Sequence, residues 1–179
     1  MPRPCSCLPL SLSPPPLLSS PNMPAQHLFD IAGIDLSQIV YGQEVIREAI
    51  PQRGDMEMLN GIVYAKPEEG RIIGFKDVRP DEFWVPGHIP GRPLFPGVLM
   101  IETGAQLASF YAHKFLEIRG FMGFGAVDEV RFRGQVTPGS RFYILGQKLW
   151  YRHHRIGCKV QGLVNGAVVF EAQIMGVEF

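Results

Sequence analysis

The sequence predicts an α+β fold in which one long helix packs against an antiparallel sheet. A single apolar, helix-like segment, Val98 to Ala112, contains only one charged residue, Glu102. Segments rich in β-branched and aromatic residues lie on both sides of it, with partial alternation of polar and apolar positions. Asn165-Gly166 between two of them is a strong hairpin signal. A fold with many antiparallel strands and one apolar helix must bury that helix against the sheet.

The first 24 residues differ in composition from the rest of the chain. They hold eight of the sixteen prolines, together with clustered serine and leucine. Prolines interrupt the apolar runs, so the continuous hydrophobic stretch of a signal peptide does not form. We therefore expect a disordered tail over residues 1–24 and a single domain over residues 25–179. Translation from Met23 is the favoured explanation of the tail, and a targeting leader is the alternative.

Local signals predict the flanking elements. Gln43 to Ile50 has helical spacing and ends at Pro51, which predicts a short helix. Met56–Ala65 and Arg71–Val78 are expected to be two strands joined by the turn-like KPEEG. Four more strands are predicted after the central helix, at Phe121–Phe132, Phe142–Tyr151, Gly157–Val164 and Ala167–Val177.

The central helix is expected to be buried by the sheet. Pro96 suits the first turn of a helix, where its missing N–H costs nothing. Pro93 to Ala112 is also about as long as a membrane span, but Pro96, Glu102 and Gln106 argue against one. Small residues would let the strands approach closely, at Gly104, Ala105, Ala108, Ser109 and Ala112.

Glu102 is the exceptional residue of this helix. Burying an ionised carboxylate is prohibitive unless it is paired, hydrogen-bonded or protonated. Gln106 lies one helical turn further on and is placed to donate a hydrogen bond to it. Two interpretations remain open at this point: a structural glutamate satisfied by Gln106, or a functional acid.

A rigid loop before the helix carries a second titratable residue, His88. Its neighbours Gly87, Pro90 and Gly91 fix the backbone of the loop. The alternative is a histidine with no role beyond the loop itself. A fixed histidine and a buried acid form a candidate acid–base pair. Gly97 lies in the first turn of the helix, where unpaired N–H groups can polarise a carbonyl oxygen. A base, an acid and an oxyanion donor are what β-elimination next to a carbonyl requires.

The stretch from Gly87 to Gln106, GHIPGRPLFPGVLMIETGAQ, resembles the signature of the FabZ-type 3-hydroxyacyl-[acyl-carrier-protein] dehydratases. That signature runs G-H-F-P-G-x-P-x-x-P-G-V-L followed by E-x-x-A-Q, and only Ile89 departs from it. The likeness extends from about Ile46 to Gly176. It includes IPQR at residues 50–53 (the family's L-P-H-R), Lys76-Asp77-Val78 with Glu82-Phe83 (K-x-V…E-x-F), and FGAVDEVRFRGQVTP from Phe124.

The resemblance implies the hotdog fold, a long central helix wrapped by a curved antiparallel sheet. It also implies a homodimer with two shared active sites, and in many members a trimer of dimers. Carried over by position, His88 acts on the C2 proton and Glu102 on the C3 hydroxyl. The Gly97 N–H binds the thioester carbonyl, and Gln106 orients Glu102. Phe and Met side chains line an acyl tunnel. No metal or nucleotide is needed, because the acyl group arrives on the phosphopantetheine of an acyl carrier protein.

The sequence departs from the family pattern at a few positions. Gln52 replaces the usual histidine before Arg53, Thr103 replaces alanine after Glu102, and GDMEMLNGIV at residues 54–63 is more polar than its counterpart. None of these changes removes a catalytic group. They bear on the shape of the tunnel, the preferred chain length and the carrier.

The net charge of zero implies no strong attraction to nucleic acid or membrane, but the charge is unevenly distributed. Residues 131–179 hold seven Lys/Arg and two Asp/Glu, a balance of +5. Carrier proteins are acidic, so Arg131, Arg133, Lys148, Arg152 and Arg155 are candidate docking residues. A solvated strand face is the competing interpretation. The three cysteines, Cys5, Cys7 and Cys158, form neither a disulfide framework nor a metal site, which favours the cytoplasm.

Four functions follow from these patterns. The leading prediction is dehydration of (3R)-3-hydroxyacyl thioesters to trans-2-enoyl thioesters in fatty acid biosynthesis. A hotdog acyl-CoA thioesterase is the alternative enzyme, because a carboxylate on the central helix also suits activation of water. A non-catalytic acyl-binding protein is the third, and a membrane protein is a distant fourth.

Overall fold

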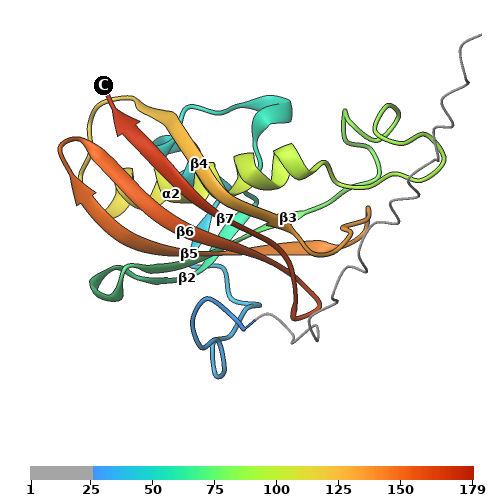
Figure 1. Cartoon of the computed structure of the whole chain (residues 1–179), viewed down its shortest axis with the longest axis horizontal. Coiled ribbons are helices and arrows are strands. Elements are labelled where there is room, and N and C mark those ends of the chain that lie inside the picture. The colour runs from blue at the N-terminus through green and yellow to red at the C-terminus, as the bar shows by residue number, and fades with distance from the viewer. Residues whose placement is uncertain (1–25) are drawn as a thin grey trace, which may run out of the picture.

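The structure, a computed structural model, describes residues 26–179, so the predicted tail over residues 1–24 lies outside the described residues. A long helix runs along one face of a curved sheet (Figure 1). The helices are α1 (Gln43–Ala49) and α2 (Gly97–Phe115). The strands are β1 (Tyr41–Gly42), β2 (Gly61–Lys66), β3 (Arg71–Asp77), β4 (Met122–Phe132), β5 (Arg141–Arg152), β6 (Arg155–Val164) and β7 (Ala167–Glu178).

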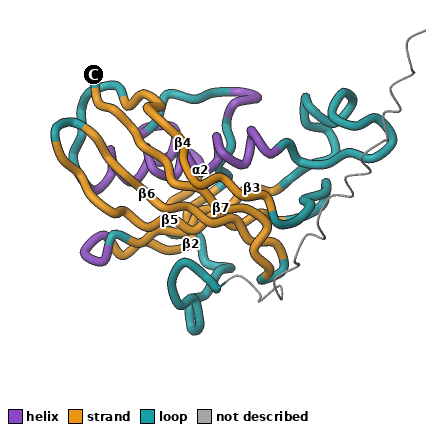
Figure 2. The backbone as a smooth tube through the Cα atoms, in the orientation of Figure 1, coloured by secondary structure: helices purple, strands orange, loops and turns teal. Residues whose placement is uncertain are grey.

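The strands form one antiparallel sheet in the order β1-β2-β3-β5-β6-β7-β4. This confirms the predicted α+β architecture. Asn165 and Gly166 both have positive φ, and Val164 pairs with Ala167, as a two-residue hairpin requires. The sheet is one continuous curved layer (Figure 2), and β4 is its last strand on one side.

Helix α2 packs against β3, β5, β6 and β7, as its apolar sequence predicted. Leu107, Phe110 and Ala112 are fully buried. A Cβ at Gly104 would come within 3.0 Å of Val160 and Ile174, so a small residue is needed where the helix crosses the sheet. One helix face is covered less well: Val98 is 71% exposed, and Ile101, Glu102 and Ala105 are half-buried.

The opposite face of the sheet is covered by the chain's own N-terminal segment, residues 26–40. Phe29 is buried there against Val63, Ile73 and Leu145 in a second apolar cluster. Gln161 holds this segment in place, because its side chain accepts a hydrogen bond from Leu28 N (2.8 Å) and donates one to the Gln26 carbonyl (3.0 Å).

Two predicted boundaries were wrong. The strand expected over Met56–Ala65 begins only at Gly61, because Gly54–Met56 is a short 3₁₀ turn and the Met56 and Met58 backbone groups bond to a side chain of α2 instead of to a strand. Pro96 is the residue before α2 instead of part of its first turn.

Within residues 26–179, no helix combines the length and the apolarity that crossing a bilayer demands.

Candidate active site

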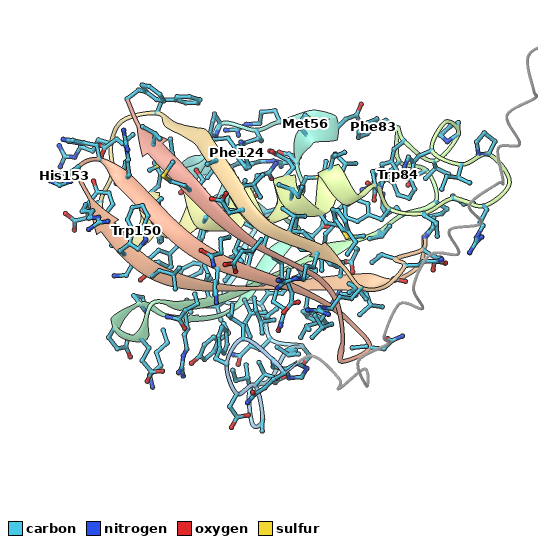
Figure 3. The ribbon with its side chains drawn as sticks, in the orientation of Figure 1. Met56, Phe83, Trp84, Phe124, Trp150 and His153 are labelled. Atoms are coloured by element: carbon cyan, nitrogen blue, oxygen red, sulfur yellow. The ribbon has the colours of Figure 1, made fainter. Side chains whose placement is uncertain are left out.

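The His88 loop connects β3 to α2 and is held by backbone hydrogen bonds. The His88 N–H donates to the Trp84 carbonyl at 2.7 Å, and the Gly87 N–H donates to the same oxygen at 3.2 Å. Ile89 has a φ of 63°, which is rare for a β-branched residue. Such a conformation persists only where its surroundings impose it, and it is common at functional sites. Figure 3 places Trp84 at the end of the molecule opposite His153.

The His88 imidazole is oriented by a hydrogen bond of 2.8 Å between Nδ1 and the Leu94 carbonyl. A carbonyl oxygen can only accept, so Nδ1 carries the hydrogen. In the neutral ring the lone pair then lies on Nε2. The residue is exposed in the protomer, so Nε2 can be reached by a bound molecule.

Glu102 lies in the second turn of α2 and is held by Gln106, as the spacing predicted. Gln106 is 1% exposed, and its Nε2 donates to Glu102 Oε1 at 2.7 Å. The same Gln106 nitrogen donates to the Met56 carbonyl at 2.7 Å, and Gln106 Oε1 accepts a hydrogen bond from the Met58 N–H at 2.9 Å. The amide therefore has one possible orientation, which fixes one carboxylate oxygen of Glu102 and leaves the other for chemistry.

Glu102 lines a cavity of about 200 Å³. Most of the lining is apolar and includes Phe and Met side chains: Ala105, Phe121, Met122, Phe124, Ile156 and Met175. Two of these side chains are largely exposed in the protomer, Phe121 at 61% and Phe124 at 52%. The cavity suits a short apolar chain whose polar end reaches Glu102.

Gly97 is the first residue of α2, so its N–H has no partner within the helix and lies at the positive end of the helix dipole. A Cβ on Gly97 would lie 2.8 Å from the Phe132 ring. The site therefore leaves little room for a larger residue here. The position suits the predicted role of an oxyanion donor.

Within the protomer the structure does not bring His88 and Glu102 together. His88 does not line the Glu102 cavity, and no hydrogen bond joins the two side chains in the described part of the chain. One chain thus presents the two candidate groups at separate places.

A family model described as the FabA-like domain matches residues 50–173, which contain every one of these groups. The chain belongs to the FabA-like domain family. Its fold is the hotdog fold, as predicted.

Solved structures support the fold of this FabA-like domain. The dehydratase heterocomplex ApeI:P from Xenorhabdus doucetiae superposes with a TM-score of 0.64 at 16% identity, covering 75% of this chain and 90% of that one. Cj0977, a sigma28-regulated virulence protein from Campylobacter jejuni, gives 0.57 at 14% identity, covering 76% and 88%. The uncharacterized protein PH1136 from Pyrococcus horikoshii gives 0.54 at 13% identity, covering 68% and 84%.

The five predicted docking residues of the FabA-like domain do not form one patch. Arg152 and Arg155 flank the turn between β5 and β6, where Arg155 pairs with Val177 of β7. Arg131 of β4 pairs with Glu171 of β7. Glu171 lies six residues, or roughly 20 Å, from Val177 along β7. Arg133 is bonded to Glu171, and Lys148 is half-buried with its ammonium 6.0 Å from the centroid of the Tyr111 ring.

Cys158 is not a candidate nucleophile. It is buried in β6, and burial raises the pKa of its thiol to about 12. The thiol is therefore protonated and unreactive at neutral pH. The other two cysteines lie outside the described residues.

Sequence reasoning missed the residues that support the site. The backbones of Met56 and Met58 fix Gln106, although the segment was predicted to be a strand. In the sequence, Lys76 and Glu82 stand out only as part of a family-like motif, and no local pattern marks Trp84. These residues lie close together in sequence, but no local pattern shows that the Lys76–Glu82 pair is buried in the folded loop.

Replacing Gln106 with leucine should lower the free energy of unfolding by about 2–4 kcal/mol, because the Met58 N–H and the Met56 carbonyl lose their buried partner. Urea denaturation measures this. The exposed Gln135→Leu is the matched control and should change stability by less than about 0.5 kcal/mol. Equal effects of the two substitutions would contradict the fixing role of Gln106.

Proposed function

We propose that this protein is a hydro-lyase that dehydrates (3R)-3-hydroxyacyl-[acyl-carrier-protein] to the trans-2-enoyl thioester in fatty acid biosynthesis. The observation that carries the proposal is a pair of oriented groups: an imidazole whose Nε2 is free, and a carboxylate with one oxygen fixed at an apolar cavity. One of the similar solved structures is of a dehydratase heterocomplex, which agrees with this reaction class.

The reaction uses each group once. His88 Nε2 takes the C2 proton while the Gly97 N–H stabilises the negative charge that develops on the thioester oxygen. Glu102 donates a proton to the C3 hydroxyl, directly or through a water molecule, and the C–O bond breaks. The products are the enoyl thioester and water. Proton exchange with solvent then removes the proton from His88 and returns one to Glu102, which resets both groups. The steps require no metal ion or nucleotide. We propose that the reaction takes place in the cytoplasm.

We further propose that a homodimer completes the site by pairing His88 of one chain with Glu102 of the other. The helix face formed by Val98, Ile101, Glu102 and Ala105 is incompletely covered by its own sheet. Strand β4 beside it is a sheet edge that exposes Phe124 and Phe132, at 52% and 53%. An unpaired edge next to an apolar patch is typical of a surface that pairs with another chain.

Replacing Val98 with aspartate should break this dimer without unfolding the protomer. An acid in the first turn of a helix gains about 0.3–1 kcal/mol from the dipole. Repulsion from Glu102 one turn later offsets about 0.2–0.5 kcal/mol of that gain. Light scattering after size exclusion should report a monomer. The equally apolar and half-exposed Val40→Asp is the control and should leave the mass unchanged. A dimeric Val98→Asp protein would place the interface elsewhere.

The assay that tests the function follows enoyl formation from hydroxyacyl-carrier substrates of several chain lengths. We expect enoyl product with wild-type protein and a preference for short chains, because the cavity is small. Free acid as the main product would identify a thioesterase, and tight acyl-carrier binding without turnover would identify a non-catalytic acyl-binding protein.

A further inference from the structure

A buried ion pair lies beneath the His88 loop. Lys76 Nζ, at the end of β3, is 3.0 Å from Glu82 Oε2, and the two side chains are only 5% and 7% exposed. Removing two charges from water is costly, and a well-packed apolar pair of similar size is often as stable or more stable. The attraction between the two charges alone therefore gives no reason for an ion pair at this position.

The carboxylate of Glu82 organises the backbone that precedes His88. Oε1 accepts a hydrogen bond from the Arg79 N–H at 2.8 Å, and Oε2 accepts one from Trp84 Nε1 at 3.0 Å. The Trp84 carbonyl in turn accepts the His88 N–H at 2.7 Å. Glu82 is thus two hydrogen bonds away from the His88 backbone, through a tryptophan that is 5% exposed.

The same ion pair contacts the other end of the loop. Lys76 Nζ lies 5.9 Å from the centroid of the Phe95 ring, and that ring packs against Trp84 with centroids 5.7 Å apart. The Phe95 N–H donates to the Val136 carbonyl at 2.7 Å. Phe95 directly follows Leu94, whose carbonyl orients the His88 imidazole. One contact that fixes His88 therefore comes from Trp84, which is bonded to the ion pair, and the other from the residue directly before Phe95.

We propose that Glu82 is a positioning residue for His88, with Lys76 as the ion-pair partner of its buried carboxylate. Only an ionised carboxylate offers acceptors to Arg79, Trp84 and Lys76 together, because a glutamine amide presents a donor at one of its two ends. The loop it holds includes the strained residue Ile89, which needs an imposed conformation. This role rests on the dehydratase function proposed above.

The test replaces the pair with apolar residues, Lys76→Met together with Glu82→Leu. We expect a folded protein with a lower melting temperature, because the Arg79 N–H and Trp84 Nε1 lose their acceptor. The kcat for enoyl formation should fall by about 10- to 100-fold, with a nearly unchanged KM. The matched control is Asp81→Asn, which removes the exposed Arg79–Asp81 pair of the same loop and should leave kcat unchanged. A folded double variant with wild-type kcat would overturn the proposal.

A second readout does not depend on activity. The ¹H–¹⁵N signals of the His88 ring, assigned by their absence in His88→Ala, should shift or broaden in the double variant and stay in place in Asp81→Asn. The single variant Glu82→Gln should show the same change in the His88 signals. It replaces the double variant in this test if the double variant does not fold. Unmoved His88 signals would overturn the positioning role. A wild-type protein without dehydratase activity would instead overturn the proposed function, while the ring signals still decide the role of Glu82.

Discussion

Replacing Glu102 with glutamine should lower kcat for enoyl formation about 10³-fold, within the range that a general acid contributes. Glutamine has the same size, and its side-chain oxygen can still accept the hydrogen bond from Gln106 Nε2. The fold is therefore preserved, but the side chain has no proton to give to the C3 hydroxyl. Steady-state kinetics with a hydroxyacyl-carrier substrate measures the effect.

The matched control is Glu48→Gln, an exposed position on α1. It should leave both kcat and the melting temperature unchanged. Retention of the wild-type kcat by Glu102→Gln would return Glu102 to the other interpretation of the sequence, a structural residue satisfied by Gln106.

Replacing Gly97 with proline should lower kcat about 10²- to 10³-fold, because it removes the N–H that we propose binds the thioester oxygen. The backbone accepts proline here. The first helical position favours it, and Pro96 already has the extended conformation (φ −59°, ψ 133°) that the residue before a proline requires.

Gly97→Ala isolates the N–H from the effect of size. Both variants place a Cβ about 2.8 Å from the Phe132 ring, but alanine keeps the N–H. Phe132 is 53% exposed and can move aside. The alanine variant should therefore lose much less activity than the proline variant. Equal losses in the two variants would mean that crowding of Phe132, and not an oxyanion contact, makes glycine necessary.

The features that the sequence predicts well are those set by neighbouring residues. Asn165-Gly166 forms its hairpin because both residues tolerate positive φ. Glu102 and Gln106 meet because they lie four residues apart on one helix. The apolar pattern from Val98 to Ala112 predicted the buried helix, and the structure extends it by three residues to Phe115.

The features that escaped prediction depend on contacts between distant residues or on unusual turn chemistry. The strand expected from Met56 starts late because the Gln106 side chain, about fifty residues away in sequence, takes its backbone hydrogen bonds. His153 and His154 turn the chain between β5 and β6 with positive φ at both residues, without the asparagine or glycine that indicates such a turn. The Lys76–Glu82–Trp84 contacts likewise depend on the folded sheet.

The meeting of His88 and Glu102 is the part of the site that neither local pattern nor a single protomer supplies. The most direct test is a heterodimer purified from differently tagged His88→Ala and Glu102→Gln chains. If each site draws His88 from one chain and Glu102 from the other, one of its two sites is intact. The heterodimer should then show about half of the wild-type activity, although each parent homodimer is inactive. A heterodimer as inactive as its parents would contradict the shared site.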